Sequence, residues 1–433
     1  MVTKYDVFME LYAQSGPQKI IALVKSLKQK KSEYDQIRKI LETLAEMKLI
    51  TKNKYGYEKV MNAKNQHLFE MMKYCLQNGV NYNDLFNKKV AQYLSKAFFR
   101  RSFTANDLHL HPRTFSQISS LLEKNGFLII LSRKPFKAMV PYNSFLGDLV
   151  VYYGYHPLVV KKQQNEYFNE IQKELVNFKR LRAKNMRKYQ ELLETFQIKF
   201  IHHSLSIEGS PVTLAQTIKL LRDQIVPENL SVESVQEVQN YQKAFLQMLQ
   251  NVRDELPLTK ESILNYHFIA LQHKPQWAGK IRDEMVIIRG NEKFKVAAPR
   301  EIEPLLNHLI EKYNEFGKPR KIKNNFSIVN KGLHTLFTMK KHSLKEIFDF
   351  TAYLHNEFQH IHPFFDGNSR TTRLITFHFL QMNEIPIFDI PLGMLEEYIF
   401  STKGAKKRDD CRLGQVLQQI ILYNLKTINE SLA

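Results

Sequence analysis

The most informative part of this chain reads His362-Pro363-Phe364-Phe365-Asp366-Gly367-Asn368-Ser369-Arg370-Thr371-Thr372-Arg373. Apolar residues recur at three- and four-residue steps before it, from Leu344 to Ile361, and again after it, from Leu374 to Leu380. This spacing predicts two buried helices. Because a proline has no backbone N–H to donate inside a helix, Pro363 predicts that the stretch forms a turn between them.

The polar residues of this turn have the chemistry that a bound phosphate requires. A glycine-containing turn at the start of a helix exposes backbone N–H groups and the positive end of the helix dipole. Arg370 and Arg373 add guanidinium groups along one side of that helix. Asp366 offers a hard oxygen ligand for Mg²⁺, and His362 can take a proton from an attacking hydroxyl near neutral pH. Any one of these residues alone would more often be structural, but together they predict a site for phosphoryl or nucleotidyl transfer.

The stretch resembles the signature of the Fic family, H-x-F-x-D/E-G-N-x-R-x-x-R, and the resemblance spans residues 200–400 approximately. It implies a helical Fic core that moves AMP from ATP to a Ser, Thr or Tyr hydroxyl of a protein substrate, with ATP and Mg²⁺ as cofactors. It also implies a role for each residue of the turn: His362 as the catalytic base, Asp366 as the Mg²⁺ ligand, Arg370 at the γ-phosphate, Arg373 at the other phosphates, and Gly367, Asn368 and Ser369 as the anion hole.

Ser369 departs from the family pattern, because most members carry glycine at this position. Its backbone N–H stays available for phosphate if its φ is negative, whereas a positive φ would cost on the order of 1 kcal/mol. Phe364 is typical of the family, and we expect it to pack the turn into the core.

A second motif lies upstream, at Ser204-Leu205-Ser206-Ile207-Glu208-Gly209, and resembles the inhibitory motif of the family, S/T-x-x-x-E-G/N. The resemblance implies that Glu208 pairs with Arg370, so that ATP binds only in a non-productive pose. We expect Ser204, Glu208 and Gly209 to form this switch in an inhibitory helix at residues 201–222. Without the downstream motif, Glu208 would read as an ordinary glutamate before a glycine that ends a helix.

Residues 285–296 read as two short strands around Gly290-Asn291, a credible hairpin turn. They follow Gly279-Lys280-Ile281-Arg282, which looks like the segment that leads into the flap of the family. The resemblance implies that this flap adds a strand of the target protein and aligns its hydroxyl with His362. An ordinary surface hairpin is the alternative.

The first half of the chain contains two copies of the order helix, helix, helix, hairpin. The first copy has its third helix after Ser32 and its hairpin near residues 49–60, and the second has them at residues 112–125 and 127–140. This order resembles a winged helix-turn-helix, whose third helix enters the major groove of DNA. The alternative is a pair of small helical domains that bind protein. The second recognition helix would open with Arg113, Thr114, Ser116 and Gln117.

Positive charge is concentrated in the same half. The chain has 433 residues and a formal net charge of +20; residues 1–200 hold 34 Lys and Arg against 17 Asp and Glu, and the remainder holds 29 against 26. Clustered positive charge suits the phosphate backbone of nucleic acid, so we expect this half to bind double-stranded DNA. A basic surface without a nucleic-acid partner is the alternative.

These observations predict a mainly α fold: winged helix-turn-helix units at residues 1–62 and 63–158, a linker helix at 159–200, and a helical Fic domain with a small β-hairpin flap at 201–433. No apolar stretch is long enough to span a membrane, no signal sequence opens the chain, and Cys75 and Cys411 suggest no disulfide framework. We therefore expect a cytoplasmic protein with no membrane partner. A homodimer is compatible with both halves, but no residue pattern requires one.

Two other functions stay open. The chain could be a DNA-binding transcription regulator whose Fic domain only senses nucleotide, although the intact His362 disfavours this because a sensor does not need the base. The same site could also remove AMP from a modified protein, with Glu208 aligning a water molecule.

Overall fold

The computed structural model describes residues 2–98, 100, 102–141, 143–156, 166–288, 291–317, 342–386, 389–404 and 408–433. Over these residues the chain is mainly helical, as predicted, and its strands form two separate two-stranded sheets. By internal contacts the chain divides into two units, Met1–Asn125 with Ser144–Val159, and Gly126–Asn143 with Val160–Ala433.

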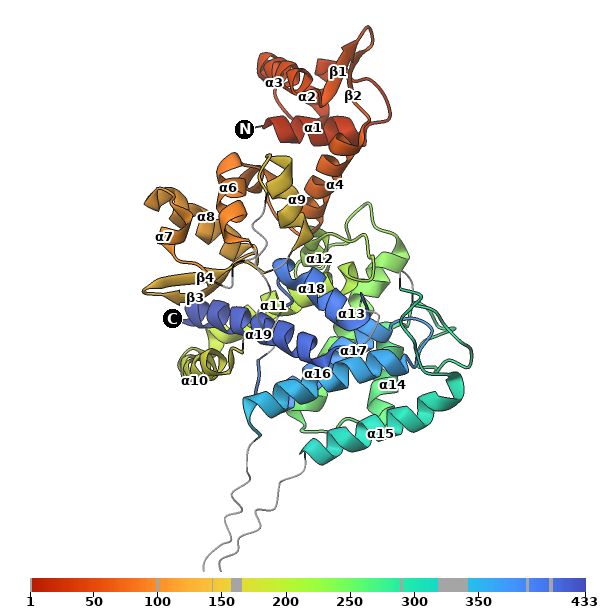
Figure 1. Ribbon diagram of the computed structural model, residues 1–433. Coiled ribbons are helices and arrows are strands. Elements are labelled where there is room, and N and C mark those ends of the chain that lie inside the picture. Colours follow the sequence, from red (N-terminus) through yellow and green to blue (C-terminus); the bar gives the residue numbers. More distant parts are fainter. Residues whose placement is uncertain are drawn as a thin grey trace, which may run out of the picture. The chain divides into compact units, whose positions relative to one another are not determined.

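The first unit opens with three helices and a hairpin in the predicted order. The hairpin pairs Ile50 with Lys59, and Tyr57 exchanges backbone hydrogen bonds of 2.7 and 2.9 Å with Gln18. Gly56 (φ 144°) lies against the Gln18 carbonyl, where a side chain would not fit. The helices and strands of this unit are α1 (Lys4–Ala13), α2 (Ile20–Ser26), η1 (Lys31–Glu33), α3 (Tyr34–Glu46), β1 (Ile50–Asn53), β2 (Gly56–Lys59), α4 (Ala63–Gln77), α5 (Tyr82–Leu85), α6 (Lys88–Ala97), α7 (Ala105–Leu108), α8 (Pro112–Lys124) and α9 (Ser144–Tyr152) (Figure 1).

Side chains connect the two helical groups within this unit. The Asp6 carboxylate accepts hydrogen bonds from Tyr82 at 2.6 Å and from Asn83 at 3.1 Å. The hydroxyls of Tyr5 and Tyr153 lie 3.0 Å apart. The first two predicted domains therefore share polar contacts, although their assignment as winged helix-turn-helix units stays a prediction.

The second unit is built around α17, in which every residue from Asn368 to Leu380 is buried. Helices α13, α14 and α16 pack against α17, and α19 packs against α16 and α10 (Figure 1). The helices and strands of this unit are β3 (Ile129–Arg133), β4 (Phe136–Met139), α10 (Phe168–Lys184), α11 (Met186–Ser206), α12 (Leu214–Leu221), α13 (Val232–Arg253), α14 (Lys260–Ala270), α15 (Pro299–Gly317), α16 (Leu344–Ile361), α17 (Asn368–Met382), η2 (Leu392–Met394), α18 (Leu395–Ile399), η3 (Phe400–Gly404) and α19 (Asp410–Leu432).

The predicted single linker helix is two helices in the structure. The helix is interrupted at Asn185, which lies between α10 and α11. The side-chain amide of Asn185 donates to the carbonyl of Leu432 at 2.9 Å. Helix α10 packs along α19 as part of the second unit. Residues 159–165 of the predicted linker lie outside the described residues. Residues 201–222 likewise form no single inhibitory helix: α11 ends at Ser206, and α12 begins at Leu214.

The hairpin β3–β4, predicted as the wing of the second winged helix-turn-helix, belongs to the second unit by its contacts. Arg133 pairs with Glu430 of α19 through hydrogen bonds of 2.7 and 2.6 Å. Gly393 donates its backbone N–H to the carbonyl of Gly126 at 3.1 Å, an approach that leaves no room for a side chain on Gly393. The boundaries at residues 62, 158 and 200 stay predictions.

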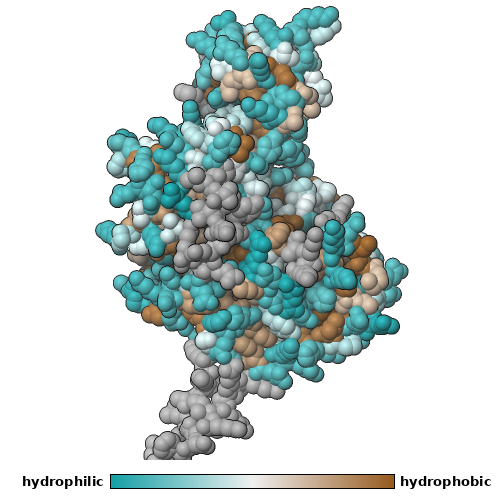
Figure 2. Space-filling model, in the orientation of Figure 1, coloured by the Kyte–Doolittle hydropathy of each residue, from teal (hydrophilic) through white to brown (hydrophobic). Residues whose placement is uncertain are grey.

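The face shown in Figure 2 is mostly hydrophilic, with apolar side chains in small patches. Among the described helices, none combines the length and the apolar character that crossing a lipid bilayer requires.

Candidate functional site

The turn between α16 and α17 is shaped by two residues in the left-handed region of backbone conformation. His362 (φ 47°) caps the C-terminus of α16, and Gly367 (φ 77°) caps the N-terminus of α17. Between them the Asn368 side chain closes the turn, because it accepts from the N–H of Phe364 at 2.9 Å and donates to the carbonyl of Phe364 at 2.7 Å. The side chain of Asn368 therefore holds the turn, which leaves only its backbone to line an anion hole.

Phe364 is fully buried, as predicted, and lies flat on the His267 ring of α14, with ring centroids 3.6 Å apart. His267 accepts a hydrogen bond from the N–H of Gly279 through Nδ1 and contacts the Asp366 carbonyl through Nε2, both at 2.9 Å. Burial lowers the pKa of His267 to about 4. The ring is therefore neutral at pH 7 and positions the turn rather than transferring protons.

Gly367 occupies a crowded position at the start of α17. A Cβ atom there would lie 2.7 Å from the Leu271 side chain and 3.1 Å from Nε2 of His267. Ser369 lies inside α17 and is not among the described residues with positive φ. Its backbone therefore meets the condition set by the sequence analysis, and its N–H belongs to the first helical turn, where the helix itself supplies no acceptors.

His362 is held through its backbone by Arg282, a residue whose importance the sequence analysis missed. Arg282 is 2% exposed and donates from Nε to the His362 carbonyl at 2.7 Å. Its two other nitrogens donate to the carbonyls of Glu284, at 2.7 Å, and Ala297, so one guanidinium joins the turn to two points of the segment between α14 and α15. The imidazole Nδ1 of His362 lies 3.3 Å from the Gln359 carbonyl. A proton on Nδ1 would leave the lone pair on Nε2, as a general base requires.

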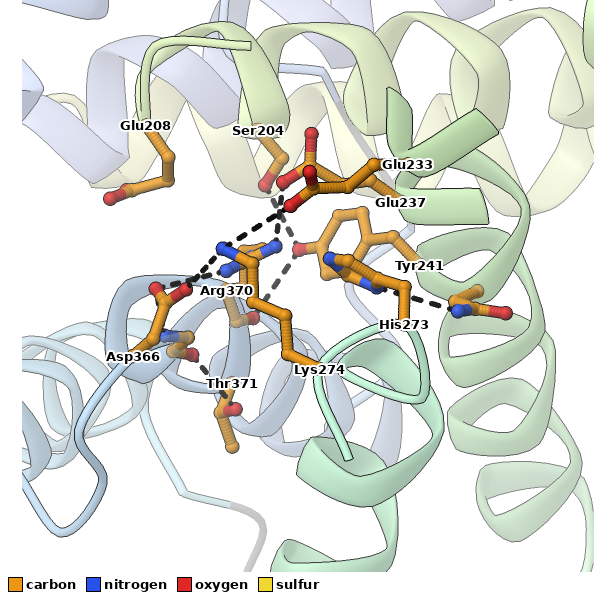
Figure 3. Close-up of polar contacts among 12 residues, drawn as sticks. Ser204, Glu208, Glu233, Glu237, Tyr241, His273, Lys274, Asp366, Arg370 and Thr371 are labelled. Carbon is orange, nitrogen blue, oxygen red and sulfur yellow. Dashed lines mark hydrogen bonds and ion pairs between the residues drawn. The ribbon is translucent and has the colours of Figure 1, made fainter. Parts of the chain in front are cut away.

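Asp366 lies between two cations. Its Oδ1 accepts from Nη2 of Arg370 at 3.0 Å, and its Oδ2 accepts from Nζ of Lys274 at 3.0 Å (Figure 3). Burial alone would raise the pKa of Asp366, but the charge of Arg370 and the hydrogen bond from Lys274 outweigh it and lower the pKa to about 2. Asp366 is therefore an ionised carboxylate at pH 7.

The described residues contain no group of three His, Cys, Asp or Glu side chains arranged to hold a metal ion. Mg²⁺ often takes only one or two protein carboxylates and completes its shell with water and substrate phosphates. A single ionised Asp366 beside a helix N-terminus fits this mode of binding, with Lys274 as the cation that the metal would displace.

Arg370 is 2% exposed and pairs with a glutamate that the sequence analysis did not identify. Its Nη1 donates to Oε1 of Glu237 on α13 at 2.9 Å (Figure 3). Its Nε is buried and has no hydrogen-bond partner among the described residues. The carbonyl of Arg370 accepts from the Tyr241 hydroxyl, at 3.3 Å, from the same helix.

The motif predicted to be inhibitory contacts Arg373, and the predicted pair between Glu208 and Arg370 is wrong. Oε1 of Glu208 lies 3.4 Å from both terminal nitrogens of Arg373. Arg373 donates from Nη2 to the carbonyl of Ser204 at 2.8 Å and from Nε to the Ser204 hydroxyl. Arg373 lies one helical turn further along α17 than Arg370 and contacts the end of α11. Arg370 is instead paired with Glu237.

Gly209 (φ 90°) ends α11 in the manner expected of a helix-terminating glycine. Its N–H donates to the carbonyl of Ser206 at 3.0 Å, and the N–H of Ser210 donates to that of Leu205 at 3.1 Å. Glu208 therefore precedes a helix stop, as the alternative interpretation of the sequence holds, and its ion pair is with Arg373 rather than with Arg370.

The predicted flap strands do not form in the described part of residues 285–296; Gly290 lies outside the described residues. The N–H of Asn291 bonds to the carbonyl of Ile288 at 3.0 Å, and the N–H of Phe294 bonds to that of Asn291 at 3.1 Å. Successive turns thus use backbone groups that a two-stranded ladder would need. Met285 and Ile287 are 64% and 73% exposed.

Comparison with known proteins finds matches to the part of the chain that contains this turn. A family model described as Fic/DOC family matches residues 257–380. Protein adenylyltransferase Fic of Drosophila persimilis is 27% identical over 210 residues, which is 48% of this chain and 36% of the relative. The protein of the same name from Drosophila grimshawi is 26% identical over 210 residues, 48% of this chain and 38% of the relative. The chain thus spans little more than a third of the length of these relatives.

Solved Fic structures also align with the chain. A Fic domain containing signaling protein from Bacteroides thetaiotaomicron aligns at 20% identity and a TM-score of 0.49, over 61% of this chain and 97% of that chain. Fic-1 from C. elegans aligns at 16% identity and a TM-score of 0.44, over 96% and 99% of the two chains. The match to the family model contains the whole turn from His362 to Arg373, and residues 257–380 of this chain are thus similar to the Fic/DOC family.

Proposed function

We propose that this chain is an autoinhibited protein adenylyltransferase that transfers AMP from ATP to a Ser, Thr or Tyr hydroxyl of a protein. The observation that carries the proposal is the arrangement of the turn: His362 caps the end of α16, Asp366 lies just before α17, and Arg370 and Arg373 lie in the first two turns of α17. The name of the Drosophila relatives, protein adenylyltransferase Fic, supports the same reaction.

In this proposal the triphosphate binds at the N-terminus of α17, where backbone N–H groups and the helix dipole favour an anion. The oxygen of the target hydroxyl attacks the α-phosphorus and forms a new O–P bond. The bond from the α-phosphorus to the bridging oxygen breaks, and pyrophosphate leaves with that electron pair. His362 takes the hydroxyl proton on Nε2, while Arg282 holds the backbone of His362 in place.

Asp366 would hold Mg²⁺ together with phosphate oxygens, and the metal would offset negative charge on the leaving pyrophosphate. Arg370 and Arg373 would bind the phosphate chain with their guanidinium groups. Both guanidinium groups are buried and held by hydrogen bonds, so they are oriented before the nucleotide arrives.

The ion pair between Glu208 and Arg373 is the proposed resting lock. Burial disfavours the charge of Arg373, but Tyr241 and Glu208 raise its pKa, so the guanidinium stays ionised. While Glu208 occupies the terminal nitrogens, Arg373 cannot give them to phosphates. The pair is long, at 3.4 Å, and the Glu208 side chain is 25% exposed, so a ligand or partner protein can displace the carboxylate more readily than a fully buried one.

Position-specific labelling of ATP tests this proposal. With ATP labelled at the α-phosphate, we expect covalent label on protein, whereas label at the γ-phosphate leaves with pyrophosphate. His362→Ala should abolish the covalent label but still bind MgATP. Covalent γ-label would contradict AMP transfer, and binding of MgATP by both proteins without any covalent label would favour the nucleotide-sensing alternative.

We also infer that the first unit binds double-stranded DNA. The exposed face of α8 carries Arg113, Ser116, Gln117 and Ser120, and none of the exposed residues of this helix is acidic. Arginine and glutamine can read base edges in the major groove, and serine can contact phosphates. The exposed positions of α3 include Asp35, Glu42 and Glu46, so we assign the reading helix to α8.

Fluorescence anisotropy with a labelled duplex tests the DNA interface. Arg113→Ala should weaken binding by about tenfold, because it removes a contact to a base or phosphate. Lys64→Ala, which removes one exposed charge from α4 of the same unit, should change affinity by about twofold or less. Equal effects of the two substitutions, or no binding at low salt, would contradict the assignment.

A further inference from the structure

Arg370 is held by a carboxylate that does not belong to the inhibitory motif. Glu237 lies on α13, its side chain is 18% exposed, and its Oε1 accepts from Nη1 of Arg370 at 2.9 Å. Figure 3 shows Glu237 pointing from α13 toward the guanidinium, with Asp366 on the other side of it. The contact is shorter than the 3.4 Å pair between Glu208 and Arg373, and its cation is equally buried.

The metal-binding carboxylate of the turn also has an internal partner. Nζ of Lys274 lies 3.0 Å from Oδ2 of Asp366, where a cation would bind. The three charged side chains that the proposed reaction uses, Asp366, Arg370 and Arg373, are therefore each paired with another residue of the protein. Glu237 holds Arg370, Glu208 holds Arg373, and Lys274 holds Asp366.

A triphosphate and Glu237 compete for the same guanidinium. The carboxylate and the phosphate oxygens are both anionic acceptors, and Glu237 already takes Nη1 of Arg370. The other nitrogens of Arg370 include Nε, which is buried and has no hydrogen-bond partner among the described residues. A phosphate that bound to these nitrogens would be repelled by the negative charge of Glu237, because a buried site screens charges weakly. Removing the charge of Glu237 should therefore favour nucleotide, whereas a residue that merely oriented Arg370 would weaken nucleotide binding when neutralised.

We propose that Glu237 is a second inhibitory carboxylate, which withholds Arg370 from the phosphates as Glu208 withholds Arg373. This inference rests on the proposed function of the turn as a nucleotide site. Since the two glutamates act on different guanidinium groups, the loss of Glu208 leaves Arg370 still engaged. Neutralising both should release the site more than neutralising either one.

Calorimetric titration of MgATP into the full chain tests the inference. All proteins carry His362→Ala, so that no nucleotide is consumed, and the affinity is compared before and after adding Glu237→Gln. Glutamine keeps the size of the side chain and one acceptor oxygen while removing its charge. We expect MgATP to bind about tenfold more tightly, an effect in the usual range for coupled sites.

Glu233→Gln is the matched control, because Glu233 lies one turn earlier on α13 and its side chain is 67% exposed. In the site, its Oε1 lies 4.0 Å from Nζ of Lys274. We expect less than a threefold change in MgATP affinity from this variant. Equal tightening by both variants would reduce the effect to general surface charge and would overturn the inference.

The outcomes also separate this inference from the proposed function. If neither the His362→Ala protein nor its Glu208→Gly derivative binds MgATP, the proposed nucleotide site is wrong. If MgATP binds but Glu237→Gln leaves the affinity unchanged or weakens it, the second inhibitory carboxylate is wrong and the nucleotide site stands. A melting curve without ligand checks folding. Glu237→Asp, which keeps the charge but withdraws it by one methylene, should also tighten binding and replaces the glutamine variant if that one does not fold.

Discussion

Oε1 of Glu208 lies 3.4 Å from both terminal nitrogens of Arg373, the last residue of the turn motif. The backbone carbonyl of Ser204, four residues earlier on α11, accepts a hydrogen bond from the same guanidinium at 2.8 Å. One contact thus comes from a partly exposed side chain and the other from the buried end of a helix. Only the first can be released without unfolding α11, which makes Glu208 the movable part of the proposed lock.

Gly367→Ala should lower the stability of the second unit against unfolding. The substitution forces a side chain to φ 77° and places its Cβ 2.7 Å from Leu271, so we expect a loss of about 2–4 kcal/mol in the free energy of unfolding. Urea denaturation measures this loss. Gly317→Ala is the control, because a Cβ there has open space, and it should change stability by about 1 kcal/mol or less. Similar losses in both variants would contradict the crowding at Gly367.

Arg282→Lys should slow AMP transfer without weakening nucleotide binding. One ammonium group cannot reproduce the fork that joins the carbonyls of His362, Glu284 and Ala297, so the backbone of the proposed base should loosen. We expect transfer to fall by about 10- to 100-fold, while MgATP affinity stays within about twofold.

Lys280→Ala, which removes an exposed charge two residues away, is the control for Arg282 and should leave both quantities unchanged. Transfer rate from labelled ATP and MgATP affinity from calorimetry are measured on the same preparations. A parallel fall of both in Arg282→Lys would mean that this residue shapes the nucleotide site rather than the base.

The second unit should lose stability between pH 7 and pH 5, in part through His267. Burial lowers the pKa of His267 from 6.5 to about 4, so over this window the unfolded chain binds the proton and the folded chain does not. Stability therefore rises with pH between these values, and acidification to pH 5 should cost about 2 kcal/mol from this residue alone.

Urea denaturation of wild type and His267→Phe at both pH values measures this contribution as a change in pH dependence. Burial also lowers the pKa of His202, His355 and His378, so the variant should keep part of the slope. An unchanged slope in His267→Phe would show that His267 titrates alike in the folded and unfolded states.

Local chemistry made the turn predictable from the sequence. Pro363 and Gly367 mark the boundaries of two helices with strong apolar periodicity, and both helices and the turn occur where these signals place them. The backbone of Ser369 could also be judged, because a residue inside the first turn of a helix has negative φ. The three helices and hairpin before residue 60, and the later order α6, α7, α8, β3, β4, followed from the same kind of signal, whereas α4 and α5 were not predicted.

The sequence could not predict which glutamate pairs with which arginine, because the paired residues lie far apart in the chain. Glu237 and Arg370 are separated by 133 residues, and Glu208 and Arg373 by 165. A motif can single out Glu208 as a candidate inhibitory residue but does not say which of two arginines on one helix it contacts. The flap strands failed for a related reason: a strand requires a pairing partner, and alternating residues near Ile287 could not show that the backbone would form turns instead.

Intact-mass spectrometry after incubation with MgATP shows whether Glu208 restrains an AMP-transferring site whose base is His362. Three proteins are compared: wild type, Glu208→Gly, and Glu208→Gly with His362→Ala. We predict at least about tenfold more covalent AMP on Glu208→Gly than on wild type, and none on the double variant. Equal modification of wild type and Glu208→Gly, or an AMP adduct that persists without His362, would contradict the account.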